Sequence, residues 1–326
     1  MSSLDRILPF LRPIEDLLAD PDITEVMVNA GGRRVFVERA GRLLPVERVL
    51  EPRNLTVAIK NIARACGDEI SDLQPILDAR LEDGSRVAAM FPPCSVDGPT
   101  LTVRKFGRRY TLADLVASAM LSEDQAAVLR DAVRDGRNTL ISGGTGTGKT
   151  TLLNALAATI PPEDRIVLIE ETSEIQLDLP NVVRFEARRA VSPLGQEATT
   201  PAVTISELVR ATLRHRPDRI ILGEVRGVEA ADLLQALNTG HRGSLSTIHA
   251  NTADQAPIRL AHCAAAAQTG LPLTAVEAAV RRVVDLVVHL ERRNGSRAVS
   301  CILDSRTANS SGHKDVVGLP SPTMGS

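Results

Sequence analysis

The sequence predicts a small α+β domain over residues 1–106, followed over residues 117–306 by a larger α/β domain with a mostly parallel sheet. Two observations lead to this prediction. The first third of the chain alternates short strands with one helix, whereas the rest repeats strand–helix units. The length of 326 residues also suits about two domains. We expect residues 107–116 to form a linker, and residues 307–326, rich in Ser, Gly and Pro, to be a disordered tail.

In the first domain, the spacing of apolar residues indicates several strands and one helix. Asn54–Cys66 has apolar residues at helical spacing. Turn sequences such as Glu82-Asp83-Gly84-Ser85 separate β-like runs and indicate hairpins. The expected strands are Ile23–Asn29, Arg34–Glu38, Ile76–Leu81, Arg86–Phe91 and Thr100–Lys105.

In the second domain, helix-start signals alternate with buried-type strands. Ser122 with Gln125, and Thr204 with Glu207, have the spacing of capping boxes. We expect Ala190–Ala202 to be a loop. The expected strands are Asn138–Ser142, Arg165–Glu170, Asn181–Glu186, Arg219–Gly223 and Ser244–His249, followed by a hairpin of Val283–Leu290 and Arg297–Ile302.

The composition argues against several classes of protein. A formal net charge of −2, no Trp and a single Tyr argue against nucleic acid as the main partner. The four cysteines form no C-x-x-C pair, so neither a zinc site nor a redox pair is indicated. The N-terminus does not resemble a signal peptide, and no run of about 18 apolar residues occurs. We therefore expect a cytosolic chain.

The most informative stretch is LISGGTGTGKTTLL, in which Gly143, Gly148, Lys149 and Thr150 fit G-x-x-x-x-G-K-[ST]. A strand enters this loop and a helix leaves it, which is the context that phosphate binding needs. Lys149 would reach the β- and γ-phosphates of a nucleoside triphosphate, and Thr150 would bind Mg²⁺. The expected phosphate-binding residues are Gly143, Gly144, Thr145, Gly146, Thr147, Gly148, Lys149, Thr150 and Thr151.

Acidic and histidine residues follow three other expected strands. Glu224 ends the run RIILGE, where a carboxylate can serve the Mg²⁺ shell or orient the attacking water. Glu170 and Glu171 begin an acidic run, in which one or two carboxylates would face a metal unless the run is a solvated turn. Either His241 or His249 could contact the γ-phosphate, or satisfy only a local hydrogen bond.

Two arginines of the first domain, Arg86 and Arg104, are further candidates. An arginine from another domain or subunit can stabilise the charge that develops on a γ-phosphate. In a chain so rich in arginine, surface arginines are the simpler interpretation from residue type alone.

Four motifs then occur in a fixed order. They are Gly143–Thr150, the acidic run Ile169–Gln176, the segment Leu213–Arg226 and the histidine segment Gly240–Asn251. Together they resemble the motifs of the secretion-superfamily traffic ATPases of type II secretion, type IV secretion and conjugation. The D-G-S-R-V and T-V-R-K segments resemble the N-terminal domain of that family. The acidic run reads Glu-Glu where many relatives have Glu-Asp.

Segments that occur in other branches of this superfamily, and that are not found in this sequence, indicate the branch to which the chain is most similar. The four-cysteine module of type II assembly ATPases and the terminal helix of pilus-retraction ATPases are not found. Val283–Leu303 resembles the branch of conjugal transfer and type IV secretion.

The resemblance implies a RecA-like P-loop ATPase domain, a homohexameric ring, and nucleotide bound between the two domains. It assigns catalytic roles to Lys149 and Glu224, support of metal and water to Glu170 and Glu171, and a sensor role to His249. Glu171 would join Thr150 in holding Mg²⁺. Arg86 and Arg104 match the nucleotide-contacting arginines of the family's N-terminal domain.

The ring would power a conjugative type IV secretion system from the cytoplasmic face of the inner membrane, with inner-membrane components as partners and no sequence-specific binding of nucleic acid. Three alternatives stay open: a tight-adherence or type IV pilus assembly ATPase, a RecA-like nucleic-acid motor, and a scaffold in which ATP only sets the shape of the ring.

Overall fold

The structure is a computed structural model that describes residues 10–39, 41–81, 84–105, 110–188, 201–267, 270–293 and 296–305. The chain divides into two compact units, Met1–Arg108 and Arg109–Ser326, which are described one at a time. The expected tail, most of the expected loop at 190–202 and part of the expected linker lie outside the described residues. No helix among the described residues is both long enough and apolar enough to cross a membrane.

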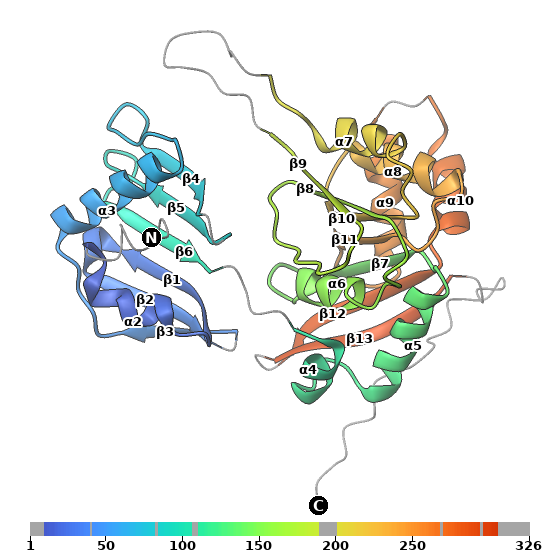
Figure 1. Ribbon diagram of the computed structural model, residues 1–326, viewed down its shortest axis with the longest axis horizontal. Coiled ribbons are helices and arrows are strands. Elements are labelled where there is room, and N and C mark those ends of the chain that lie inside the picture. Colours follow the sequence, from blue (N-terminus) through green and yellow to red (C-terminus); the bar gives the residue numbers. More distant parts are fainter. Residues whose placement is uncertain are drawn as a thin grey trace, which may run out of the picture. The chain divides into compact units, whose positions relative to one another are not determined.

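The first unit is an antiparallel sheet of six strands in the order β3-β2-β1-β6-β5-β4 (Figure 1). The strands are β1 (Ile23–Asn29), β2 (Arg34–Arg39), β3 (Arg42–Val46), β4 (Ile76–Arg80), β5 (Arg86–Met90) and β6 (Thr100–Arg104). The helices are η2 (Arg12–Ile14), α2 (Glu15–Ala19), η3 (Ala30–Gly32) and α3 (Pro52–Ala65). Helix α3 buries Leu55, Ile59 and Ile62 in the core that it shares with the sheet.

The second unit is a sheet of seven strands in the order β13-β12-β7-β11-β10-β8-β9, parallel throughout except for the edge strand β13. The strands are β7 (Thr139–Gly143), β8 (Ile166–Glu170), β9 (Val182–Glu186), β10 (Arg219–Val225), β11 (Leu245–His249), β12 (Leu286–Arg293) and β13 (Ser296–Asp304). The mostly parallel sheet expected from the sequence is thus confirmed.

Helices cover both faces of this sheet (Figure 1). One face packs against α4 (Leu112–Ala117), α5 (Glu123–Arg134) and α6 (Lys149–Ala157). The other packs against α7 (Ile205–Thr212), α8 (Glu229–Asn238), α9 (Gln255–Ala265) and α10 (Leu273–Val283). Since the central strands are buried on both faces, they read in the sequence as continuous apolar runs.

Helix boundaries follow local chemistry. The capping boxes expected at Ser122 and Thr204 are both present. A third capping box joins Thr111 and Asp114 and starts α4, so residues 112–116 of the expected linker are helical.

Candidate active site

The glycine-rich loop connects β7 to α6 and depends on backbone shapes that favour glycine. Gly143 has a φ of 153°, and a Cβ built on it would lie 2.5 Å from the carbonyl oxygen of Leu290. Gly148 precedes α6 with a φ of 95°. These two residues let the chain leave the buried strand and turn tightly into the helix.

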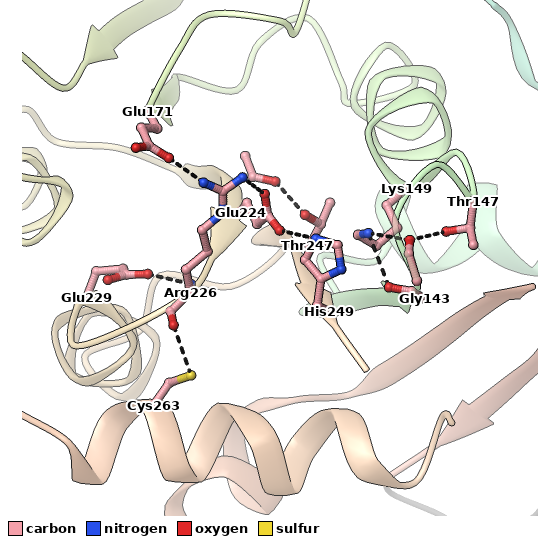
Figure 2. Close-up of polar contacts among 12 residues, drawn as sticks. Gly143, Thr147, Lys149, Glu171, Glu224, Arg226, Glu229, Thr247, His249 and Cys263 are labelled. Atoms are coloured by element: carbon pink, nitrogen blue, oxygen red, sulfur yellow. Dashed lines mark hydrogen bonds and ion pairs between the residues drawn. The ribbon is translucent and has the colours of Figure 1, made fainter. Parts of the chain in front are cut away.

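Lys149 lies at the first position of α6 with its ammonium group against the loop. Its Nζ donates hydrogen bonds to the carbonyl oxygens of Gly143, at 3.2 Å, and Gly144, at 2.9 Å (Figure 2). The Thr147 hydroxyl donates to the Gly144 carbonyl at 2.9 Å. Burial lowers the pKa of Lys149, while the negative charge of Glu224 opposes this shift.

The start of α6 is suited to bind an anion. No side chain caps it, and its first turn contains no acidic residue. Gly144, Thr145 and Gly146 are exposed along the loop, and Thr150 and Thr151 lie in the first helical turn. Free N–H groups and the positive end of the helix dipole both favour phosphate at such a position.

Strand order brings the other expected site residues to the same edge. Strand β11 lies beside β7, and His249 pairs in register with Gly143. Strand β10, which contains Glu224, lies beside β11, and the Thr247 hydroxyl donates to the Gly223 carbonyl at 2.7 Å. Because these strands are parallel, their carboxyl ends meet at one edge of the sheet, as expected for a ligand site.

Glu224 lies at the centre of a chain of charged contacts (Figure 2). Its Oε1 is buried and lies 2.7 Å from Nε2 of His249. Its Oε2 accepts a hydrogen bond from Nη2 of Arg226 at 2.6 Å. Nη1 of Arg226 donates to Glu171, also at 2.6 Å, so one guanidinium bridges both carboxylates.

His249 is electrostatically connected to both sides of the site. Burial lowers its pKa, and the positive charge of Lys149 lowers it further, whereas Glu224 acts in the opposite direction. The lowered pKa favours the neutral ring, which carries one N–H donor.

The structure separates the two neighbouring acids of the acidic run. Glu171 faces Arg226. Glu170 is buried at 4 % exposure, and its Oε1 accepts hydrogen bonds from the backbone N–H groups of Glu174 and Ile175. Burial raises the pKa of Glu170 to about 7, although these hydrogen bonds oppose the shift. Glu170 therefore anchors the turn that follows β8.

The residues fit a magnesium ion that is shared with phosphate. Thr150 offers a hydroxyl at the loop, and Glu224 offers a carboxylate oxygen, Oε1, that is buried beside His249. Among the described residues, no group of three or more His, Cys, Asp or Glu side chains could form a complete metal cage. Mg²⁺ usually binds through few protein oxygens, together with phosphates and water, so this donor set suits it.

Arg86 and Arg104 belong to the first unit, apart from the unit that contains the loop. They pair in register on β5 and β6, and a nitrogen of Arg86 lies 3.7 Å from Asp78. Their expected contact with nucleotide stays a prediction.

The two histidines weighed in the sequence have different surroundings. His241 lies near the end of α8, with Nδ1 3.0 Å from the Ala236 carbonyl, which is a local contact. His249 is the histidine that reaches Glu224. Sequence reasoning gave no role to Arg226. Arg226 lies two residues after Glu224 in an extended segment, and this spacing indicates that both side chains point to the same side.

Comparison with known proteins identifies the family. The model of the family "Type II/IV secretion system protein" matches residues 10–316. The chain belongs to this family.

Among members of the type II/IV secretion family, the conjugal transfer protein TrbB of Rhizobium radiobacter is 39 % identical over 287 residues, covering 86 % of this chain and 83 % of that protein. The type IV secretion system protein PtlH of Bordetella pertussis is 36 % identical over 324 residues, covering 90 % and 93 %. These similarities support the type IV secretion traffic ATPase that the sequence motifs suggested.

Solved structures agree with the fold. The VirB11 ATPase of the Brucella suis type IV secretion system, in complex with sulphate, is 32 % identical with a TM-score of 0.50, over 93 % of this chain and 95 % of that one. The ATPase DotB of Legionella pneumophila is 20 % identical with a TM-score of 0.63, over 93 % and 80 %. The RecA-like ATPase fold with a preceding N-terminal domain is therefore confirmed.

Proposed function

We propose that this chain is a Mg²⁺-dependent ATPase that powers a conjugative type IV secretion system. The observation that supports this most is the meeting of Lys149, Glu224 and His249 at one edge of the parallel sheet, where the phosphate-binding loop begins. A generic nucleotide binder needs the loop alone. A carboxylate beside the loop adds the group that hydrolysis requires.

Each residue has a distinct role in this proposal. Lys149 and the first turn of α6 bind the phosphates, and the Thr150 hydroxyl and Glu224 hold Mg²⁺ and orient the attacking water. When bound, Mg²⁺ neutralises charge on the phosphate oxygens. His249 keeps Glu224 in place from one side and Arg226 does so from the other. Phosphoryl transfer depends mostly on such positioning and charge stabilisation.

The cellular role is proposed from the relatives. TrbB is a conjugal transfer protein, and PtlH and VirB11 belong to type IV secretion systems. We infer that this chain assembles as a homohexamer at the cytoplasmic face of the inner membrane and works with membrane components of such a system. Arg86 and Arg104 are proposed to contact nucleotide, as the family resemblance implies.

The test is ATP turnover of the purified full-length protein, measured with and without Mg²⁺, DNA and lipid vesicles. The proposal predicts Mg²⁺-dependent turnover without DNA, and loss of turnover in Lys149→Ala. Turnover that requires DNA would favour a nucleic-acid motor instead. Nucleotide binding without turnover in the wild type would favour the scaffold. Full turnover in Lys149→Ala would overturn the assignment of the loop.

A further inference from the structure

A second histidine, His289, is buried directly behind the phosphate-binding loop. It lies on β12 and is 2 % exposed. Strand β12 pairs with β7 in parallel, and the register sets His289 beside Ser142 and Leu290 beside Gly143. His289 therefore directly precedes Leu290, whose carbonyl oxygen leaves no room for a side chain at position 143.

One side of the His289 ring contacts the strand that leads into the loop. Its Nδ1 lies 2.9 Å from the Ser142 hydroxyl, which is itself fully buried. Ser142 directly precedes Gly143, whose carbonyl accepts a hydrogen bond from Lys149. The ring is thus joined through Ser142 to the residues that hold the Lys149 ammonium group.

The ring also reaches the segment that contains the proposed sensor. A hydrogen bond with the backbone of Asn251, two residues beyond His249, is one of the causes that raise the pKa of the ring. Since Nδ1 faces Ser142, the other ring nitrogen is the one available to Asn251. Burial lowers the pKa of His289, although the negative charge of Glu291, whose Oε1 lies 4.0 Å from Nε2, opposes this shift. The neutral ring has one donor and one acceptor for Ser142 and Asn251.

The burial of the polar His289 ring on this face of β12 has to be explained, because the preceding residue on this face is apolar. Val287, two residues earlier on the same strand face, is fully buried in the apolar core that α7–α10 cover. A leucine or valine at 289 would continue that core without a desolvation cost. The histidine instead satisfies its polar atoms on two segments that are distant in the sequence, both of which enter the active site.

We propose that His289 is a positioning residue that ties the start of the phosphate-binding loop to the chain beyond His249, and so fixes the distance between Lys149 and the Glu224–His249 pair. This inference rests on the proposed ATPase function. Nucleotide binding uses the loop and α6, which keep their own hydrogen bonds, whereas turnover depends on the spacing of the two halves of the site. Loss of His289 should therefore affect kcat more than KM.

The test compares His289→Leu, His289→Asn and His289→Gln with the wild type. His289→Leu is expected to lower kcat about tenfold or more while KM for ATP changes less than about threefold. Asn can reproduce the contact of Nδ1 with Ser142 and Gln the contact of the other nitrogen, so each should recover part of kcat. Ser142→Ala by itself should also lower kcat. Combined with His289→Leu it should cause no further loss of kcat, since both substitutions remove the same interaction.

Val287→Ala is the matched control, because it opens a cavity on the same face of β12 without touching Ser142 or Asn251. It should lower Tm and leave kcat unchanged. Hydrogen exchange of the backbone in 142–149 and 249–254 is measured in parallel, without ATP. His289→Leu should speed exchange in both segments more than Val287→Ala does.

Equal exchange in the two variants, or wild-type kcat in His289→Leu, would overturn the inference. So would an equal loss of kcat in His289→Leu and Val287→Ala. If the wild type shows no turnover, the proposed function fails, and the exchange comparison still decides the role of His289.

Discussion

Nη2 of Arg226 lies 2.6 Å from Oε2 of Glu224, and the same guanidinium holds Glu171 through its other nitrogen. The side chains of Arg226 and Glu171 are 62 % and 54 % exposed, so this bridge adds little to stability. Its effect is to fix the direction in which the half-buried Glu224 carboxylate points.

Arg226→Ala should therefore lower ATP turnover about tenfold while Tm stays near that of the wild type. The pKa of His249 should rise, because the charge of Arg226 is one of the causes that lower it. Turnover, Tm and an NMR titration of His249 measure the three effects. Arg226→Lys should recover little, since an ammonium group cannot span both carboxylates. Arg281→Ala, which breaks an exposed ion pair with Glu277, is the control; an equal loss of turnover there would contradict the role of Arg226.

His249→Ala should lower kcat by about ten- to a hundredfold and leave the free energy of unfolding almost unchanged, because the ring positions Glu224 and is partly exposed. Steady-state kinetics and chemical denaturation measure the two quantities. His241→Ala is the matched control, since that ring contacts only the end of α8. If His241→Ala has the larger effect on kcat, the two histidines have been assigned the wrong way round.

The stability of the protein should depend on pH through Glu170. Burial raises the pKa of Glu170 from its ordinary 4.5 to about 7 in the folded state. Between these values the folded state binds more protons than the unfolded state, so the free energy of unfolding falls as pH rises, by up to about 3 kcal/mol. The contribution is full below the unfolded pKa and is lost as pH passes through the folded one.

Glu170→Gln keeps an oxygen for the N–H groups of Glu174 and Ile175 but cannot ionise. It should flatten this part of the pH dependence and make the variant more stable than the wild type at pH 8. Urea unfolding at pH 5 and pH 8 measures both. Parallel pH profiles for the two proteins would show that the shift of Glu170 does not contribute.

Gly143→Ala should destabilise the protein by about 1–3 kcal/mol and abolish nucleotide binding, because the new Cβ would lie 2.5 Å from the Leu290 carbonyl at a φ of 153°. Gly144→Ala is the control for stability: the nearest atom to its Cβ is 3.8 Å away. Thermal unfolding of the two variants is the measurement. Equal Tm values would mean that the loop does not need glycine at 143.

Much of the fold follows from local patterns in the sequence. The strands beside the site were predicted within a few residues, because buried parallel strands form short apolar runs between turn residues. Ser122 and Thr204 predicted helix starts correctly because a capping box acts over four residues. The edge strand β3 was missed, since its residues are mostly exposed and its apolar run does not alternate with polar residues.

Helices α9 and α10 were also missed, for different reasons. Helix α9 is rich in alanine and has Pro257 in its first turn, which hides the helical period. Helix α10 ends in the valines that precede β12, and β-branched residues also favour strands. The strand expected from Val283 begins only at Leu286, because Asp285 instead accepts a hydrogen bond from the backbone N–H of Asn138.

Site residues that lie within one sequence motif could be predicted, whereas contacts that depend on the order of the strands could not. The loop residues stand in one motif, so they could be assigned directly. The ion pair of Glu171 with Arg226, and the joining of His289 to Ser142, arise from contacts between segments that are far apart in the sequence. No spacing rule within one segment reports such contacts.

The most direct test of the account compares ATP binding and ATP turnover in Glu224→Gln. Gln keeps the size of the side chain and removes the charge that the site needs for hydrolysis. We predict that the variant binds ATP with a Kd within about threefold of the wild type and that kcat falls by about a hundredfold or more. Turnover at the wild-type rate would contradict it, because Glu224 would then be a structural acid beside a loop that only binds nucleotide.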